Sequence, residues 1–254
     1  MWSIWGYSPY QAHSSLTRVF EELMGTRNER RGFSRDRQGG GRQKNVSFLI
    51  VSEDTKSSVL YFQDLIKEVN SIRLVAEEAP KIARESKVKG CGKGEANLVR
   101  EAERIRESEL TPFDSCWIVF DKDADQDFAQ TIKAAEKAGF KVAWSNESFE
   151  LWYLLHFRNR SSYIDRKACI EALEKELGKL DPSFSYAKGA SAIFRYLTEE
   201  RRRQAIRNAE NLRAYWQESG TADCGQHNPC TQVDQLVQEL TDPEKRKELI
   251  KRKS

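Results

Sequence analysis

Residues 47–62, SFLIVSEDTKSSVLYF, decide the fold and raise the question of function. The apolar, β-prone run from Phe48 to Val51 predicts a buried strand, and the helical spacing of apolar residues after residue 56 predicts that a helix follows. The strand stops at an acid, Glu53. In open parallel sheets, functional groups gather at the carboxyl ends of the strands, so this acid indicates a site at that edge.

Strands and helices continue to alternate as far as residue 145. We expect strands at 46–51, 72–77, 115–120 and 141–145. We expect helices between them at 56–70, 95–108 and 126–138, with Gly139 as the C-cap of the last one. This βα alternation predicts an α/β fold with a mainly parallel central sheet flanked by helices.

From residue 147 the pattern predicts helices only. They are expected at 147–158, 165–178, 188–217 and 231–252. The chain should therefore have three parts, which are a basic N-terminal extension and linker (1–43), an α/β core (44–146) and a C-terminal helical region packed on that core (147–254).

Composition narrows the class of protein. The chain has 254 residues, of which 39% are apolar and 32% are charged, as in a soluble globular protein. No apolar run reaches the roughly 20 residues that span a bilayer, so we expect no membrane partner. The five cysteines are odd in number and scattered, which predicts a reduced, cytoplasmic protein.

The net charge of +3 is unevenly distributed. Residues 27–44 hold seven Lys or Arg and two acids, and residues 245–254 hold six and one, so each segment carries +5. These basic ends flank an acidic body and could contact the phosphate backbone of nucleic acid. The alternative is that they are solvated tails, since charge runs usually are.

Acidic residues follow two of the predicted strands. Glu53 comes directly after the first strand, and Asp121 and Asp123 come directly after the third. If the two strands are neighbours, the three carboxylates converge, and their mutual repulsion calls for a hard divalent cation such as Mg²⁺. Such a site suits phosphoryl transfer or phosphodiester cleavage. The alternative is that these acids are helix caps or loop residues, as is common after a strand.

Four stretches in order resemble the RloB family. VSEDTKSSVLYF is similar to its Glu-Gly motif, WIVFDKDAD to its Asp-x-Asp motif, AWSNESFELWYLLHF to its most specific segment, and NPCTQVDQLVQEL to its C-terminal Pro-x-Thr segment. The resemblance covers about residues 44–240. It implies a Toprim-like domain, of the group shared by topoisomerases, primases and several nucleases.

The resemblance also implies an activity. RloB-like proteins are linked to bacterial anti-phage defence, often beside an ATPase partner, and a Toprim nuclease that acts on RNA or DNA is the implied enzyme. By this analogy Glu53 is the general acid or base, and Asp121 and Asp123 hold Mg²⁺, for which Mn²⁺ is expected to substitute. The three acids together form the expected metal site. The sequence is also compatible with an oligomer.

Two positions depart from the family pattern. The family has Gly after its glutamate and a second acid five positions after that glutamate, where this chain has Asp54 and Ser58. Asp54 either adds charge at the metal site or points away from it. These departures leave room for a second class of function, a non-catalytic Toprim-like module that binds nucleic acid or an ATPase partner.

The segment SNESFELWYLLHF, residues 145–157, has two interpretations. In the functional one, Asn146 and Glu150 line the active site and His156 contacts the substrate or Glu150. In the structural one, Asn146 caps the helix, Glu150 accepts hydrogen bonds from backbone amides, and His156 is a satisfied core residue. We include Glu150 among the expected catalytic residues.

Basic residues near the C-terminal helices are candidate phosphate contacts. They are Lys188, Arg201, Arg202 and Arg203, together with Arg207. A solvated helix face is the alternative for the arginine run. Cys224, His227 and Cys230 could suggest zinc, but they are only three ligands at a spacing unlike common zinc sites.

The basic N-terminal extension gives the first testable prediction. If the extension binds nucleic acid, deleting residues 1–43 should weaken that binding and reduce its salt dependence, because fewer phosphates are neutralised. Binding measured over a series of salt concentrations checks this. An unchanged salt slope would leave the extension as a linker only.

Overall fold

The computed structural model describes residues 45–71, 79–92, 95–122, 128–187 and 191–252. Four of the sequence expectations lie outside these residues, namely the N-terminal extension (1–43), the strand at 72–77, Asp123 and Lys188.

Among the described residues, the strands form one sheet in the order β2-β1-β3-β4-β5. Their bounds are β1 Phe48–Ser52, β2 Lys87–Gly90, β3 Ser115–Asp121, β4 Lys141–Asn146 and β5 Cys230–Thr231. The first four strands are parallel, and β5 runs antiparallel to β4. The predicted α/β fold with a mainly parallel sheet is confirmed, but the expectation of helices only after residue 147 is wrong at β5.

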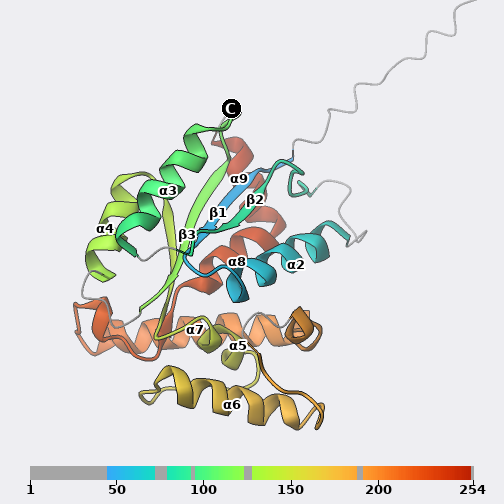
Figure 1. Cartoon of the computed structure of the whole chain (residues 1–254), viewed down its shortest axis with the longest axis vertical. Helices are drawn as coiled ribbons and strands as arrows, with labels where there is room; N and C mark the ends of the chain where they lie inside the picture. Colours follow the sequence, from blue (N-terminus) through green and yellow to red (C-terminus); the bar gives the residue numbers. More distant parts are fainter. Residues whose placement is uncertain (1–44, 72–78, 93–94, 123–127, 188–190, 253–254) are drawn as a thin grey trace, which may run out of the picture. The chain divides into compact units, whose positions relative to one another are not determined.

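Helices cover both faces of this sheet (Figure 1). Their bounds are α2 Ser57–Ser71, α3 Glu95–Glu107, α4 Phe128–Lys137, α5 Glu150–Leu155, α6 Arg166–Gly178, α7 Glu199–Glu218, α8 Val233–Thr241 and α9 Pro243–Lys251. Two 3₁₀ segments, η1 Ser191–Tyr196 and η2 Cys224–Gln226, lie between them. Helices α3 and α4 lie on one face of the sheet, whereas α2 and α8 lie on the other.

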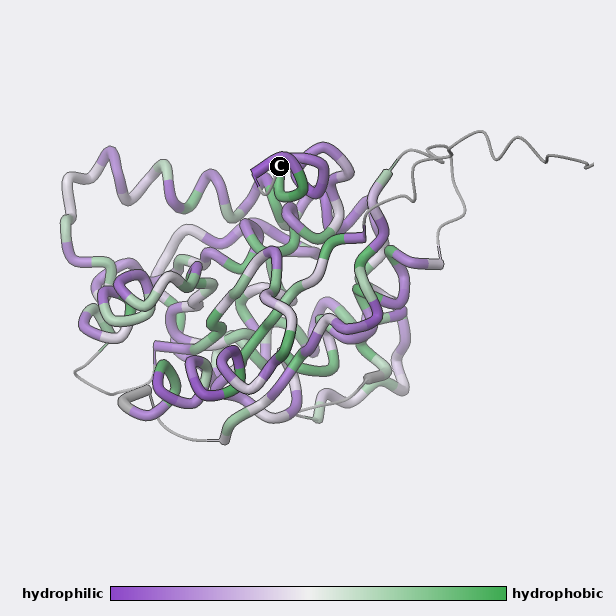
Figure 2. The backbone as a smooth tube through the Cα atoms, turned by 90° about the horizontal axis from the view of Figure 1, so that it is seen from above, coloured by the Kyte–Doolittle hydropathy of each residue, from purple (hydrophilic) through white to green (hydrophobic). Residues whose placement is uncertain are grey.

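The alternation of side chains along the strands produces two hydrophobic clusters. In β1, Phe48 and Ile50 join the larger cluster, with α2, α5, α7 and α8. Leu49 and Val51 point the opposite way and join the smaller cluster, with α3 and α4. Both faces of β1 are therefore buried, which explains its uninterrupted apolar sequence. Figure 2 shows these apolar strands at the centre and mostly polar helices around them.

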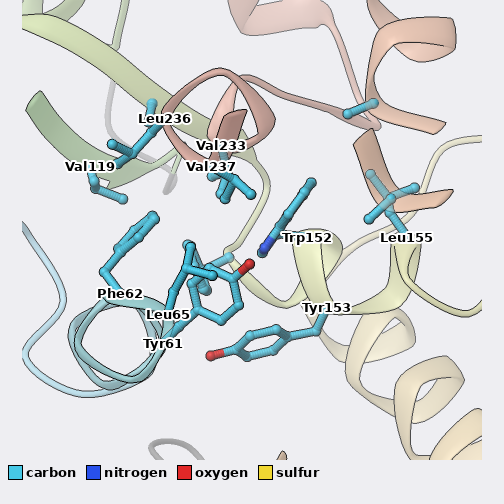
Figure 3. Packing of buried hydrophobic residues seen from close by; sticks show 14 of the residues in the cluster. Tyr61, Phe62, Leu65, Val119, Trp152, Tyr153, Leu155, Val233, Leu236 and Val237 are labelled. Carbon is cyan, nitrogen blue, oxygen red and sulfur yellow. The ribbon is translucent and has the colours of Figure 1, made fainter. Parts of the chain in front are cut away.

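The larger cluster joins the sheet to the C-terminal helices (Figure 3). Phe62 and Leu65 of α2, Val119 of β3, Trp152 of α5 and Leu236 of α8 are all buried in it. Aromatic rings meet edge to face there, as in the pair Phe62 and Phe149 with centroids 5.9 Å apart. The residues after 147 thus share a core with the sheet.

Three predicted elements differ from the structure. The stretch 87–90, where no strand was expected, is strand β2, which pairs with β1. The helix expected at 188–217 begins only at Glu199, where the Thr198 side chain accepts a hydrogen bond from the Arg201 amide. The helix expected at 231–252 is interrupted at Pro243, because proline cannot continue the hydrogen bonding of α8 and instead opens α9.

Helix α7 has 20 residues, but its sequence is rich in charge. Within the described part of the chain, no helix is both long and apolar enough to cross a membrane.

A buried ion pair joins α7 to α8 and β5. Asp234 is fully buried, and its carboxylate accepts hydrogen bonds from both terminal nitrogens of Arg213, with 2.7 Å between Nη2 and Oδ2. Arg213 Nη1 also donates to the Thr231 carbonyl at 2.8 Å. Burial raises the pKa of Asp234, and Arg213 opposes that rise. Arg213 supplies the cation for this carboxylate, and Gln238 Nε2 donates a further hydrogen bond to Oδ2 at 3.3 Å.

Replacing Arg213 with Met should destabilise the fold by roughly 3–5 kcal/mol, since it leaves a buried carboxylate without its cation. The double variant Arg213→Met with Asp234→Leu should recover most of that loss. Urea unfolding measures both free energies. A double variant as unstable as the single one would contradict this explanation.

Candidate active site at the carboxyl edge of the sheet

The order of the strands places Glu53 and Asp121 at the same edge of the sheet. Strands β1 and β3 are adjacent and parallel, with Ser52 opposite Val119. The chain passes from β1 to β2 on one side and then returns to β3 on the other, so the strand order reverses between β1 and β3. Ligands bind at such reversals, outside the carboxyl ends of the strands. The condition on which the sequence argument depended, that these two strands are neighbours, is met.

The backbone at Glu53 is held from both sides. Its N–H donates to the Val119 carbonyl of β3 at 2.9 Å, and its carbonyl accepts from Gly92, after β2, at 2.9 Å. Gly90 lies so close that a Cβ atom there would be 2.6 Å from Thr55 Cα. Only glycine at position 90 leaves room for this loop, so the turn that carries Glu53 is packed against β2.

Asp121 ends β3 and already has a cationic neighbour. Its Oδ2 lies 3.2 Å from Nη2 of Arg166, at the start of α6. The Arg166 backbone N–H donates to Glu147 Oε2 at 2.9 Å, which fixes this end of α6 beside the end of β4. The Arg166 side chain is 39% exposed, whereas that of Asp121 is 14% exposed. Asp121 therefore lies in a partly enclosed position with an arginine able to balance its charge.

The two departures from the family pattern have structural roles. Asp54 Oδ2 accepts from the Ser58 backbone N–H at 3.1 Å and so caps the first turn of α2. The Ser58 hydroxyl is buried and lies 2.6 Å from that of Ser52, the last residue of β1. At position 58 this chain thus has a neutral hydrogen bond between strand and helix.

Glu150 lies in a buried polar cluster beside this edge. It is 4% exposed, and its Oε1 accepts from the Tyr186 hydroxyl at 2.7 Å. Burial, followed by the charge of Glu150, raises the pKa of Tyr186 and raises that of the Cys169 thiol to about 12. The Tyr153 hydroxyl donates to the Ser57 carbonyl at 2.9 Å, which links α5 to the start of α2. Glu150 therefore has a hydroxyl donor, not the backbone amides of the structural interpretation.

The structural interpretation also differs from the structure at two other residues. Helix α5 has no side-chain cap; Asn146 instead donates to the Gly225 carbonyl at 3.1 Å. Among the described residues, buried Asn146 Oδ1 has no hydrogen-bond partner. His156 is buried but not satisfied, because its Nε2 also lacks a described partner.

The residues at this edge suit a hard cation in the type of donor that they offer. Carboxylates follow two adjacent strands, and Asn146 adds an unpaired buried oxygen at the end of β4, next to β3. Among the residues that the structure describes, no three His, Cys, Asp or Glu side chains are grouped as metal ligands. The third expected ligand, Asp123, is not among them. Of the three acids expected at the site, Glu53 and Asp121 are described, and Asp121 would be the described ligand.

The three arginines of α7 that were expected to contact phosphate differ in their burial and in their partners. Arg202 is 4% exposed and pairs with Glu68 at 2.7 Å, so its burial does not fit the predicted contact with phosphate. Arg203 is exposed but pairs with Glu199 at 2.9 Å. Arg201 lies near His156 and donates to the Tyr196 carbonyl at 2.9 Å.

The zinc interpretation of residues 224–230 gains no support. The His227 ring stacks on Trp216 with 5.0 Å between centroids, and its Nε2 lies 2.8 Å from the Thr221 carbonyl. Cys230 is buried, and burial raises the pKa of its thiol to about 12.

Sequence reasoning missed three residues of this edge. Arg166 and Tyr186 come from segments far along the chain, and no local pattern connects them to Asp121 or Glu150. Gly90 did carry a signal, since a glycine beside a predicted functional turn indicates close approach of the backbone.

Comparison with known proteins agrees with the motifs. The family model described as RloB-like protein matches residues 48–240. Searches of curated proteins and of solved structures found no match. The matched region runs from the first residue of β1 to the last turn of α8 and contains Glu53, Asp121 and Glu150. The chain is therefore a member of the RloB-like family.

Proposed function

We propose that this protein is a metal-dependent nuclease that hydrolyses phosphodiester bonds in RNA or DNA. The observation that carries the proposal is the placement of Glu53 and Asp121 at the carboxyl ends of two adjacent parallel strands, where the strand order reverses between β1 and β3. Two carboxylates there attract a divalent cation, and a cation there suits a phosphate substrate. Asp123, two residues after Asp121 in the sequence, is proposed as the further ligand.

In this proposal Asp121 and Asp123 hold Mg²⁺, and Mn²⁺ substitutes for it. The bound cation would polarise the scissile phosphate and stabilise charge on its oxygens. Glu53 transfers a proton to or from an oxygen at that phosphate, as a carboxylate in hydrogen-bond reach can do. The backbone bonds of Glu53 to Val119 and Gly92 keep its Cα in place for this role.

Arg166 has a role that follows from its ion pair. It balances Asp121 in the free protein, 3.2 Å away. Because its side chain is 39% exposed, it can turn to a phosphate oxygen when a cation takes over the carboxylate. Glu150, the first residue of α5 and bound to the Tyr186 hydroxyl, is proposed to shape the site.

The setting is also proposed. Family membership, with the association of RloB-like proteins with anti-phage defence, supports a cytoplasmic role in defence beside an ATPase partner. The partner would control when the nuclease acts.

A second candidate is a Toprim-like module that binds nucleic acid or the ATPase without cleaving. The Asp121–Arg166 ion pair favours it, because Asp121 could be there only to hold α6. The capping role of Asp54 and the neutral Ser58 are compatible with it as well. The two candidates differ in what Asp121 does.

Replacing Asp121 with Asn should remove much of the Mn²⁺ affinity and lower cleavage by roughly 100-fold or more, the equivalent of losing several kcal/mol of charge stabilisation. Calorimetric titration with Mn²⁺ and cleavage of end-labelled oligonucleotides measure the two effects. Arg166→Gln is the matched control, since it breaks the same ion pair but keeps the carboxylate. It should retain Mn²⁺ binding. Equal Mn²⁺ affinity in the wild type and Asp121→Asn would favour the non-catalytic module.

Replacing Glu53 with Gln should keep Mn²⁺ binding largely intact and lower cleavage by roughly 10²–10⁴-fold, because an amide cannot exchange the proton. The change is nearly isosteric, and a melting curve checks that the fold survives. Wild-type cleavage by this variant at saturating Mg²⁺ would overturn the role of Glu53.

A further inference from the structure

A cavity of about 490 Å³ is lined by residues from the end of α2, the start of α7 and the junction between α8 and α9. The segment just before Ile82 also lines it, and Ile82 is bridged to Val46. Val46 precedes β1 whereas Glu53 follows it, and an extended chain over that stretch spans roughly 23 Å. The cavity therefore lies toward the opposite end of β1 from the candidate active site.

Arg246 of α9 is buried in the wall of this cavity. It is 5% exposed, its Nε donates to the Pro80 carbonyl at 2.8 Å, and its Nη1 donates to the Leu240 carbonyl. In the part of the chain that the structure describes, no carboxylate lies within ion-pair distance of this guanidinium. Burial lowers the pKa of Arg246, against the charge of Asp242, which raises it. A buried cation is costly without an anion, so this environment favours an anionic ligand.

Arg246 also has a nitrogen that a ligand can reach. Its Nη2 has no acceptor among the described residues, and it is not one of the unpaired side-chain atoms that are sealed from solvent. Lys81 lines the same cavity and is exposed, and the described ranges hold no carboxylate paired with it. These two side chains therefore keep N–H groups for an anion.

The two arginines that α7 adds to this lining are already neutralised. Arg202 Nη2 donates to Glu68 at 2.7 Å, and Arg202 Nε is sealed from solvent. Arg203 pairs with Glu199, which lines the cavity as well, at 2.9 Å. The anion is therefore expected at Arg246 and Lys81.

The rest of the lining offers an apolar wall and one further carboxylate. Val69, Pro80 and Ile206 form the apolar part. Asp242 caps α9 through Oδ1, which accepts from the Glu244 backbone N–H at 2.8 Å. Its Oδ2 is left to accept from a ligand, and a carboxylate in this position suits a hydroxyl donor.

A ligand that suits this cavity brings an anion for Arg246 and Lys81, hydroxyl groups for Asp242 and an apolar face for the wall. Inorganic phosphate brings the anion alone and is small for a cavity of this volume. A nucleotide brings all three, since it has a phosphate, a ribose whose hydroxyls a carboxylate can accept, and a flat base. We propose that this cavity binds a nucleoside monophosphate, with its phosphate on Arg246 Nη2 and Lys81, its ribose hydroxyls on Asp242 and its base against the apolar wall.

This inference goes beyond the proposed nuclease and does not depend on it, because the cavity contains none of the residues assigned to cleavage. A free nucleotide and the 5′ end of a nucleic-acid strand share the chemistry that the cavity recognises. The test therefore includes both sources.

Calorimetric titration of the full chain in EDTA compares AMP, adenosine and inorganic phosphate as probes. AMP should bind roughly tenfold or more tightly than either of the other two, because only AMP supplies the phosphate, the hydroxyls and the base together. Absence of AMP binding would overturn the inference. Equal affinity for AMP and inorganic phosphate would also overturn it, since the cavity would then be a simple anion site.

The cations are tested by substitution. Lys81→Gln should weaken AMP binding roughly three- to tenfold and leave the fold intact, because Lys81 is exposed. Lys133→Gln is the matched control, since Lys133 is exposed on α4, on the other face of the sheet, and the same charge is lost. Arg246→Met should weaken binding roughly tenfold or more, with a melting curve to check folding. An equal loss with Lys133→Gln would contradict the assignment of Lys81.

The ribose contact is tested on the ligand, so the proposal stays testable if Arg246→Met fails to fold. The 2′,3′-dideoxy analogue of AMP should bind the wild type roughly three- to tenfold more weakly than AMP. Asp242→Asn keeps a helix-capping side chain and should remove that difference. An undiminished difference in Asp242→Asn would overturn the role of Asp242.

The source of the nucleotide is decided by competition. A decanucleotide with a 5′-phosphate that displaces AMP, where the same strand with a 5′-hydroxyl does not, would show that strand ends enter the cavity. Failure of both strands to displace AMP would identify the free nucleotide as the ligand, and either result supports the proposed chemistry. Neither result touches the proposed nuclease, which Asp121→Asn and Glu53→Gln test by cleavage.

Discussion

The parallel pairing of β1 and β3 is the constraint on which the candidate site depends. Side by side and in register, these strands bring two carboxylates that are 68 positions apart in the sequence to one edge. The strands owe this position to burial on both faces, since their side chains alternate between two hydrophobic clusters. A shift of one residue in β1 would turn Phe48 and Ile50 to the wrong cluster, so packing fixes the register and thereby the acids.

The C-terminal helices add further side chains to the edge of the sheet at which Glu53 and Asp121 lie. They share the larger hydrophobic cluster with β1 and β3, so their positions are set by the same core. From there α6 directs Arg166 at Asp121, and α5 presents Glu150 to Tyr186. Neighbouring arginines of α7 have different surroundings. Arg202 is buried against Glu68, whereas Arg201 lies beside His156. The C-terminal helices thus supply side chains to the carboxyl edge and, through α7, to a cavity lined by Arg201 and His156.

The periodicity of the sequence predicted most of the α/β alternation, because strands buried on both faces and amphipathic helices leave strong local patterns. The short strands β2 and β5 were missed. Strand β2 has the sequence KVKG with little apolar character, and β5 has two residues, so only pairing with a neighbour makes them strands. Glu53 and Asp121 were predicted from their place after strands. Arg166, Tyr186 and the unpaired nitrogen of His156 depend on contacts between distant segments, which local pattern does not encode.

The central claim is that the edge between β1 and β3 holds a divalent cation. Anomalous scattering from crystals soaked in Mn²⁺ tests it directly, because the signal locates the ion without reference to activity. The account predicts a peak between the carboxylates of Glu53 and Asp121, with Arg166 turned away from Asp121. Crystals that show no peak there at saturating Mn²⁺, with the Asp121–Arg166 ion pair still closed, would contradict it.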